Sequence, residues 1–528
     1  MKQFDWLPRF LTCLQDAKVD AKVEENSSPT PTHSLILNNW DWEKAARVAS
    51  DFGCRWAGVW GDQKDKFLSI YACLVYQGDY LLLTTELDLI KSELLSHTPC
   101  FPGADRLERH LQDMFGITFK NHPNGHRWTR HQAWPKDSFP LLNDFPQEGP
   151  SESRSPADID YPFNCIQGNG VYEIPVGPVH AGIIEPGHFR FQAVGEDILR
   201  LEARLGYTHK GIEKIAVGRH PSALAQLAGR VSGDSTVAHT WAACMAMENA
   251  TDSRLPERAL FLRAILAERE RVANHLGDIG AICNDVGFSF MHIQCARLRE
   301  LWQRRNHELF SHRLLMDTIV PGGIACDLDE KEIEQLITDH KNLLRATKPL
   351  LDIINDQPSL EDRLVGTGHL SSEDARKIGC TGYVGKASSQ DFDVRRDHAY
   401  SPYDRFVPLI PVDTEGDVAA RVRIRMAEVR ESLKLMDAFL KALPAGPVKV
   451  ELTPVENEVN GLGIVEGWRG EIITYVRLDN EGRIARFFPR DPSWFTWPAL
   501  ERLIHGNIVP DFPVCNKSIN GSYSGQDL

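Results

Sequence analysis

Long stretches in the second half of the chain repeat apolar residues at the spacing of an amphipathic helix. The clearest spans residues 255–279, where Pro256 stands in the first turn and leucine, isoleucine and valine line a broad face. The same periodicity predicts helices over residues 290–316, 328–345 and 418–443. This part of the chain is therefore predicted to be mainly helical.

The first part of the chain mixes two periodicities. Helix-like and strand-like stretches follow one another there, at residues 41–52, 67–76, 80–89 and 105–115. Gly116 comes directly after the last of them, where glycine ends many helices. Residues 33–145 are therefore predicted to form a compact α+β domain.

Polar segments divide the chain. Residues 146–157 are rich in proline, serine and glutamate, show no hydrophobic periodicity and are typical of a linker. A second polar stretch, residues 24–32, follows a short helical pattern. We therefore predict that residues 1–32 form an N-terminal helix and a flexible segment, and that residues 158–528 form a second domain.

Short strand-like segments lie at both ends of that second domain, at residues 170–178, 188–194 and roughly 449–490. Together these patterns predict the fold class: an α+β N-terminal domain, followed by a mainly α-helical domain with small terminal β-sheets.

Composition narrows the range of partners. The chain of 528 residues has 59 Lys+Arg against 73 Asp+Glu, a net charge of −14, and no basic run, which argues against nucleic acid as a partner. No stretch approaches the ~18–20 consecutive apolar residues of a membrane span. Charged residues also interrupt the start of the chain, unlike a signal peptide. We therefore expect no transmembrane segment.

The cysteines do not predict a metal site. There are 11 of them, the closest two are twelve positions apart, and no C-x-x-C pair occurs. In a chain without a secretory signal, such scattered cysteines are expected to be reduced and mostly buried thiols.

Specific strings carry the interpretation further. Gly177-Pro178-Val179-His180 and the following Glu185-Pro186-Gly187-His188 resemble the opening of the large subunit of membrane-bound nickel–iron hydrogenases, and equally the related D subunit of respiratory complex I. The likeness continues through further motifs towards the C-terminus: Tyr207–Lys214, Leu255–Ala259, Asp393–Arg395 and Gly416–Val418. Residues 107–123 are similar to the complex I C subunit. Nearly the whole chain thus resembles a fused C/D-type subunit, as in formate hydrogenlyase and hydrogenase-4 large subunits.

The resemblance implies a function. The chain would be the large subunit of a hydrogenase-related, complex I-like membrane oxidoreductase, of the NADH:quinone oxidoreductase type. A metal-free cavity beside an iron–sulfur small subunit would pass electrons to quinone or another acceptor, coupled to ion translocation. The isolated chain would have no activity. The alternative is a non-catalytic coupling or scaffold subunit with a vestigial active site.

The resemblance also implies partners and a location. The partners would be the iron–sulfur small subunit together with antiporter-like and anchor membrane subunits, on the cytoplasmic side of the inner membrane. A hydrophobic pocket beside Gly233, Glu185 and Asp285 would favour the redox role. A cavity filled by phenylalanine, tryptophan and Tyr523 would favour the scaffold.

The likeness to hydrogenases fails at the metal ligands. Those enzymes hold nickel and iron with two C-x-x-C pairs, because thiolates suit nickel and can bridge two metals. Here the first pair falls on Ser232 and Ser235, and the second on Ser522 and Gly525. A protonated serine hydroxyl is a poor nickel ligand, and glycine has no side chain. We therefore expect no nickel–iron centre and no cofactor bound by this chain; the iron–sulfur cluster would belong to the partner.

Three residues are candidates for catalysis. Glu185 matches a proton-transferring glutamate of hydrogenases, and neighbouring apolar residues would raise its pKa by desolvation. The alternative is a loop carboxylate that caps a backbone segment or pairs with Arg190. Asp285 matches an aspartate behind the quinone histidine of complex I and is expected to be buried and charge-coupled, or else structural. His180 follows a Gly-Pro turn and is either a donor to a bound ligand or simply hydrogen-bonded.

Three further residues are expected to line the cavity for quinone or another acceptor. Gly233 takes the position of the complex I quinone tyrosine, three residues after Arg230. Asp393 and Arg395 match a motif whose arginine faces the iron in hydrogenases. Without iron, their expected role is to hold the shape of the cavity.

Other features favour structural interpretations. Glu213 is expected in an ion pair, with proton transfer as the alternative. His239 lies four residues after Ser235, but no acid partner is identifiable, so nucleophilic catalysis is not expected. Gly461 and Gly463 lack the context of a dinucleotide site and are interpreted as a turn in the β-rich tail.

Overall fold

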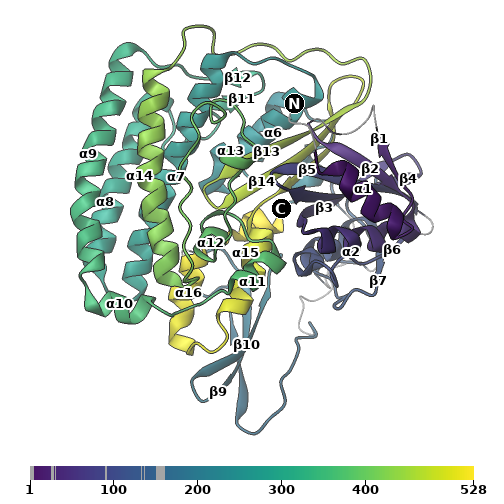
Figure 1. Ribbon diagram of the computed structural model, residues 1–528, viewed down its shortest axis with the longest axis horizontal. Coiled ribbons are helices and arrows are strands. Elements are labelled where there is room, and N and C mark those ends of the chain that lie inside the picture. The colour runs from purple at the N-terminus through teal and green to yellow at the C-terminus, as the bar shows by residue number, and fades with distance from the viewer. Residues whose placement is uncertain are drawn as a thin grey trace.

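The computed structural model describes residues 5–24, 29, 31–89, 92–131, 134–135, 137–149, 161–182 and 184–528 (Figure 1). A helical bundle occupies one side of the molecule and the sheet of the N-terminal domain the other, with the β9–β10 hairpin projecting at one end. Among the described residues, none of the helices combines the length and apolar character needed to cross a bilayer.

A five-stranded sheet forms the centre of the N-terminal domain, in the order β1-β2-β5-β4-β3. β2 and β5 run parallel, and the other neighbours are antiparallel. Its strands are β1 (Ala21–Glu24), β2 (His33–Leu37), β3 (Arg55–Lys64), β4 (Phe67–Tyr76) and β5 (Asp79–Asp88). A separate two-stranded sheet consists of β6 (Glu93–Leu95) and β7 (Thr118–Lys120). The helices of the domain are α1 (Leu7–Asp16), α2 (Trp42–Phe52) and α3 (Asp105–Phe115). Residues 21–24, assigned to a flexible segment from the sequence, form β1 because they pair with β2.

The bundle of the second domain consists of four long helices that stand side by side in Figure 1. They are α7 (Glu257–Asp285), α8 (Ser289–Phe310), α9 (Glu330–Asn355) and α14 (Val418–Lys441). The shorter helices around them are α4 (Ile212–Ala216), α5 (Pro221–Ala228), α6 (Thr236–Ala250), α10 (Pro358–Leu364), α11 (Ser372–Ile378), α12 (Gly382–Ala387) and α13 (Val394–Asp397). Each of the four amphipathic patterns seen in the sequence thus corresponds to one long helix.

Small antiparallel sheets complete the domain, as expected for its two ends. The first consists of β8 (Val171–Val176), β9 (His188–Val194) and β10 (Asp197–Arg204). The second consists of β13 (Val459–Gly467), β14 (Gly470–Leu478) and β15 (Ile484–Arg490), and a two-residue pair is formed by β11 (Ile319–Val320) and β12 (Gly323–Ile324). The chain continues through α15 (Ser493–Leu503), α16 (Phe512–Ile519) and α17 (Tyr523–Asp527). The predicted fold class is therefore confirmed.

Gly461 and Gly463 are strand residues of β13, so their interpretation as a turn is wrong. A Cβ atom at position 463 would lie 1.8 Å from the carbonyl oxygen of Ala242, and one at position 461 would lie 2.3 Å from that of Ala246. Glycine is needed there because α6 rests directly on the backbone of β13.

The two domains pack against each other through buried side chains. Trp60 of β3 stacks on Phe488 of β15, with ring centroids 5.6 Å apart. Beside them, Arg477 binds Asp62 through its Nε and Nη2 atoms, at 2.7 and 2.8 Å. The domains therefore share one hydrophobic core. Most of the predicted linker, residues 150–157, lies outside the described residues, so the domain boundaries stay a prediction.

Candidate functional site

The four positions that the hydrogenase resemblance assigns to metal ligands come together in space. Ser232 and Ser235 lie in the turn before α6, and Ser522 and Gly525 lie at the start of α17. The hydroxyls of Ser232 and Ser522 are 2.8 Å apart, and the Gly525 N–H donates to Ser522 Oγ at 2.9 Å. Two distant segments of the chain therefore meet at these four positions, Ser232, Ser235, Ser522 and Gly525, which we call the serine site.

Arg469, which sequence reasoning missed, contacts both segments of this site. Its Nη1 and Nη2 atoms each donate to a carboxylate oxygen of Asp234 at 2.6 Å, and Nη1 also donates to Ser235 Oγ at 3.0 Å. Its Nε donates to the carbonyl oxygen of Asn520 at 2.7 Å. Although burial opposes ionisation, the guanidinium lowers the pKa of Asp234. Arg469 thus joins the two serine-bearing segments, by an ion pair to Asp234 in one and a hydrogen bond to Asn520 in the other.

Asp491 closes the side of the site next to Gly525. A Cβ atom at position 525 would lie only 2.8 Å from Asp491 Cγ. Asp491 also accepts a hydrogen bond from Nε2 of His239 at 2.8 Å, so this histidine does have an acid partner, contrary to the sequence interpretation. Burial opposes ionisation, but the bond from His239 contributes most to lowering the pKa of Asp491 to about 2. Both side chains are fully enclosed.

Glu185 lies near this site but on the surface. The residue is exposed, and its carboxylate accepts the N–H of Ser524 at 3.0 Å. The predicted apolar enclosure is therefore wrong: Ile184 is itself 42% exposed, and Ile183 lies outside the described residues. Of the two structural alternatives, pairing with Arg190 is wrong, because Arg190 binds Glu173 instead. Capping is confirmed, because the Ser524 N–H that Glu185 accepts lies in the first turn of α17.

His180 lies beside an aromatic cluster formed by Tyr523, Trp497 and Phe189. Its Nε2 atom is 3.4 Å from the hydroxyl of Tyr523. A Cβ atom at Gly187 would lie 2.5 Å from the Tyr523 ring, so the space between β9 and α17 is filled. This filling corresponds to the arrangement expected for the scaffold alternative.

Gly233 is exposed and does not face a ligand-sized cavity. A Cβ atom there would meet only Met316 Cε, at 3.6 Å. The hollow that Gly233 borders measures about 20 Å³, room for no more than a water or two. Arg230 makes a surface ion pair with Asp317 at 2.7 Å.

Asp285 is exposed at the end of α7, so the prediction of a buried carboxylate is wrong for this residue. Partial burial still raises its pKa, while nearby Lys517 opposes the shift. The buried, charge-coupled carboxylate lies two helical turns earlier, at Asp278. That side chain accepts a hydrogen bond from Asn520 at 2.8 Å and is 3.2 Å from Arg425 and 3.4 Å from Lys517.

Three family models match the chain. The first, described as "Respiratory-chain NADH dehydrogenase, 49 Kd subunit", covers residues 285–461. The corresponding 30 Kd subunit model covers residues 14–151, and "Nickel-dependent hydrogenase" covers residues 210–277. Along the chain, the 30 Kd match comes before the 49 Kd match, which is the order of a fused C/D-type chain.

Relatives match over most of their length. The chain is 32% identical to formate hydrogenlyase subunit 5 of Escherichia coli, over 85% of this chain and 79% of the relative. It is 30% identical to the fused C/D protein of NADH-quinone oxidoreductase from Bacteroides thetaiotaomicron, over 81% of this chain and 84% of the relative. The chain belongs to the family of fused C/D-type subunits shared by complex I and its related hydrogenases.

A solved structure supports the same relationship within this C/D-type family. It is a chain of the membrane-bound sulfane sulfur reductase, described as an archaeal respiratory membrane complex. The match has a TM-score of 0.64 and 26% identity, and it covers 68% of this chain and 99% of that one. Relatives of this C/D-type subunit are thus components of multisubunit oxidoreductase complexes in membranes.

Asp393 and Arg395 of this C/D-type subunit lie in a buried charge cluster. Arg395 donates to both oxygens of Asp393, through Nε at 2.9 Å and Nη2 at 2.7 Å. Lys386 Nζ binds Asp393 at 2.6 Å and Glu428 at 2.7 Å. Both predicted residues are at most 2% exposed, so they stabilise the interior rather than line an open cavity.

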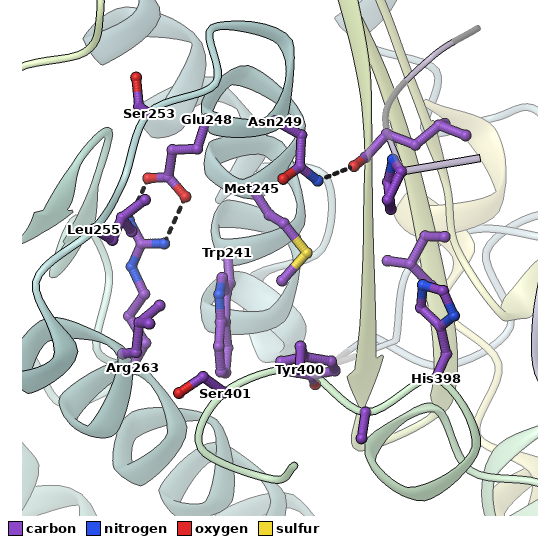
Figure 2. A pocket seen from close by; sticks show the side chains of 15 residues that line it. Trp241, Met245, Glu248, Asn249, Ser253, Leu255, Arg263, His398, Tyr400 and Ser401 are labelled. Carbon is purple, nitrogen blue, oxygen red and sulfur yellow. Dashed lines mark hydrogen bonds and ion pairs between the residues drawn. The ribbon is translucent and has the colours of Figure 1, made fainter. Parts of the chain in front are cut away.

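Figure 2 shows a pocket on another side of the C/D-type subunit, with a volume of about 350 Å³. Trp241, Met245 and Asn249 of α6 face it together with Tyr400, and the Arg263–Glu248 ion pair lies at its edge, with a shortest separation of 2.6 Å. Its size is at the lower end of the range for ligand pockets. No motif in the sequence indicated this pocket.

Arg469 and Asp491 were missed for a physical reason. Arg469 occupies the tight turn between β13 and β14, where Gly467 pairs with Gly470, and arginine in a hairpin turn usually faces water. Asp491 follows the last strand directly, a position typical of a helix cap. In the sequence, only the missing cysteine ligands pointed to a substitute at this site.

Proposed function

We propose that this chain is the large subunit of a complex I-type membrane oxidoreductase and works without a metal of its own. Electrons would pass from an iron–sulfur cluster in a neighbouring small subunit to quinone or another acceptor, and their transfer would be coupled to ion translocation. The supporting observation is the serine site, where the Arg469–Asp234 ion pair lies between the residues that replace the metal ligands.

The residues of this site do not fit a nickel–iron centre. Hydroxyls replace three thiolates, and Asp491 lies where a side chain at position 525 would begin. A guanidinium among the four positions also repels a cation. We therefore derive no step of the mechanism through nickel or iron, and the redox centres of the assembly would belong to other subunits.

His180 and Glu185 mark the surface where a redox partner would dock. They lie on the loop between β8 and β9, and both contact the start of α17. The exposed carboxylate of Glu185 could exchange protons with an acceptor bound at that interface, and His180 could donate a hydrogen bond to it. Antiporter-like and anchor subunits would connect this assembly to the cytoplasmic face of the inner membrane.

The filled space around Tyr523 favours a second candidate, a coupling subunit without catalysis. Trp497 and Phe189 pack against Tyr523, and the serine site beside them is held by hydrogen bonds between segments far apart in the chain. Such a rigid junction could transmit a change at the small-subunit face to the membrane partners without binding any acceptor.

One experiment distinguishes the two candidates. Glu185→Gln, His180→Ala and Asp285→Asn are compared in the assembled complex, with Glu173→Gln on β8 as the control for an exposed carboxylate of the same hairpin. The redox role predicts normal assembly with at least about tenfold slower electron transfer for Glu185→Gln or His180→Ala. Unchanged turnover in all three variants supports the coupling subunit. Stoichiometric nickel in the purified complex, bound by this chain, contradicts both.

A further inference from the structure

A cluster of charged side chains lies buried where α7, α12, α13, α14 and β13 meet. Every member is at most 2% exposed. We call it the Lys386 cluster; its members are Glu268, Arg271, His275, Lys386, Asp393, Arg395, Glu428 and Glu466. Because charges are expensive to bury, such a group is expected to be close to neutral overall.

Most members of the Lys386 cluster are tightly paired. Besides the bonds of Lys386 and Arg395 to Asp393, Arg395 binds Glu268 at 3.0 Å. Arg271 contacts Glu268 at 3.2 Å and Glu428 at 3.6 Å, and His275 Nε2 is 2.6 Å from Glu428. Ser432 and Tyr403 each donate a further hydrogen bond to Glu268, at 2.6 Å.

The charges of the Lys386 cluster do not balance if all its carboxylates are ionised. Four carboxylates (Glu268, Asp393, Glu428 and Glu466) face three permanent cations (Arg271, Lys386 and Arg395). Burial lowers the pKa of His275, which therefore adds no positive charge near neutral pH. One bound proton would restore neutrality.

Glu466 is the carboxylate with the weakest pairing in the described part of the Lys386 cluster. Its Oε2 accepts the N–H of Val394 at 3.0 Å, but Oε1 has no hydrogen-bond partner within the described part of the chain, and Lys386 Nζ is 3.9 Å away. Burial, followed by the charge of Asp393, raises its pKa. A protonated Glu466 is the form that suits this position.

Other charges around Glu466 are engaged elsewhere. Glu471, its cross-strand neighbour on β14, binds Arg55 and Arg490. On α6, Glu248 is neutralised by Arg263. Asp397 of α13 pairs with Arg396. Arg55 and Arg490 together carry one more charge than Glu471, but both bind Glu471. The cation of the cluster that faces Glu466 is Lys386, at 3.9 Å.

One residue both lines the pocket of Figure 2 and contacts Glu466. Tyr400 lines this pocket, and its hydroxyl accepts the backbone N–H of Glu466 at 3.2 Å. Tyr400 is partly exposed, whereas Glu466 is enclosed. Leu462 and Ile464 of β13 also line the pocket, and Glu466 follows them on the same face of the strand, because side chains two positions apart in a strand point the same way.

We propose that Glu466 is an exchangeable proton-binding site and that the pocket beside Tyr400 is its route to solvent. A hydronium ion in the pocket gives its proton to the carboxylate, one O–H bond forms on Glu466, and water is left behind; release is the reverse. Proton binding at Glu466 needs no electron donor, so the proposal does not depend on the proposed redox function.

Infrared spectroscopy of the full chain tests this proposal. In H₂O at neutral pH, the difference spectrum between wild type and Glu466→Gln should contain the carbonyl band of a protonated carboxylic acid. That band should shift in D₂O. Glu458→Gln, which removes an exposed carboxylate just before β13, should leave it unchanged. Absence of the band from the wild-type minus Glu466→Gln spectrum would overturn the proposal.

Two further results are equally decisive. A glutamine has the shape and neutral charge of protonated glutamic acid, so the proposal requires Glu466→Gln to fold at neutral pH; an unfolded variant contradicts it. Tyr400→Phe should keep the acid band but slow its shift after transfer to D₂O at least about threefold. An unchanged exchange rate in Tyr400→Phe contradicts the route through the pocket.

Discussion

Single residues at the serine site take over the structural work of a metal centre. Arg469 and Asp234 connect the turn before α6 to the β13–β14 hairpin, and Ser232 and Ser522 connect that turn to α17. Directed hydrogen bonds and one ion pair thus hold segments that thiolates and a metal hold in hydrogenases. This arrangement makes the site sensitive to small changes of shape and charge.

The lowered pKa of Asp491 predicts how the stability of the protein changes in acid. Its pKa of about 2 in the folded protein lies below that of an unfolded chain. Such a carboxylate stabilises the fold above the unfolded pKa, and the stabilisation is lost as the pH falls towards the folded pKa. We expect Asp491→Asn to lose about 2 kcal/mol of unfolding free energy at neutral pH.

Urea unfolding across a pH series measures this loss. The difference between wild type and Asp491→Asn should shrink as the pH falls from about 4 to 2. Asp391→Asn, which changes an exposed aspartate, should show no such convergence. A constant difference at every pH would contradict the assignment.

Two glycines test how closed the site is. Gly525→Ala should lower the free energy of unfolding by about 1–3 kcal/mol, because its methyl group would press against Asp491. Gly233→Ala should change stability by less than about 0.5 kcal/mol, because its methyl group enters nearly open space. Thermal unfolding of both variants provides the measurement. Equal effects would show that the site is looser than the geometry indicates.

Among the elements, α6 shows what the sequence could and could not predict. The long amphipathic helices were found because one face repeats apolar residues at helical spacing. α6 is buried on nearly all sides, so it has no polar face and no periodic signal. The candidate site shows a similar limit. The motifs assigned Ser232, Ser235, Ser522 and Gly525 to one place, and their two segments do meet there. The exposure of Glu185 and Asp285 depends on tertiary packing, which no local pattern records.

The contact of α6 with β13 yields a prediction at this scale. Gly463→Ala should lower the free energy of unfolding by about 3 kcal/mol, because the helix must move off the strand to make room for the methyl group. Gly125→Ala, with no atom within 4 Å of the added group, serves as the control. Chemical denaturation measures both. A tolerated Gly463→Ala would mean that α6 can shift without cost.

In the whole molecule, buried ion pairs bind the two domains into one unit. Besides Asp62 and Arg477, Glu213 of α4 accepts hydrogen bonds from His110 of α3 at 2.7 Å and from Arg486 of β15 at 2.5 Å. Burial opposes ionisation of Glu213, but Arg486 and His110 lower its pKa to about 2. Glu213 is thus a structural ion pair partner, the first of the two roles considered for it.

The domain junction predicts a cooperative response to mutation. Asp62→Asn should lower the free energy of unfolding by about 3 kcal/mol. The buried Arg477 keeps its charge, but the neutral asparagine binds it less strongly than the carboxylate does. Glu481→Gln, which breaks an exposed contact with Arg483, should cost less than about 1 kcal/mol. Calorimetry should show one unfolding transition for both variants. Separate transitions for the two domains in Asp62→Asn would contradict a shared core.

The Trp60–Phe488 stack and the ion pairs beside it have the character of an interface between permanent partners. In a fused chain, the covalent connection keeps the two surfaces at a high effective concentration, so their contact does not depend on how much protein the cell makes. Their burial also means that neither half presents a water-compatible surface alone. The fusion therefore supplies the two modules in equal amounts, each with the partner surface that its buried face requires.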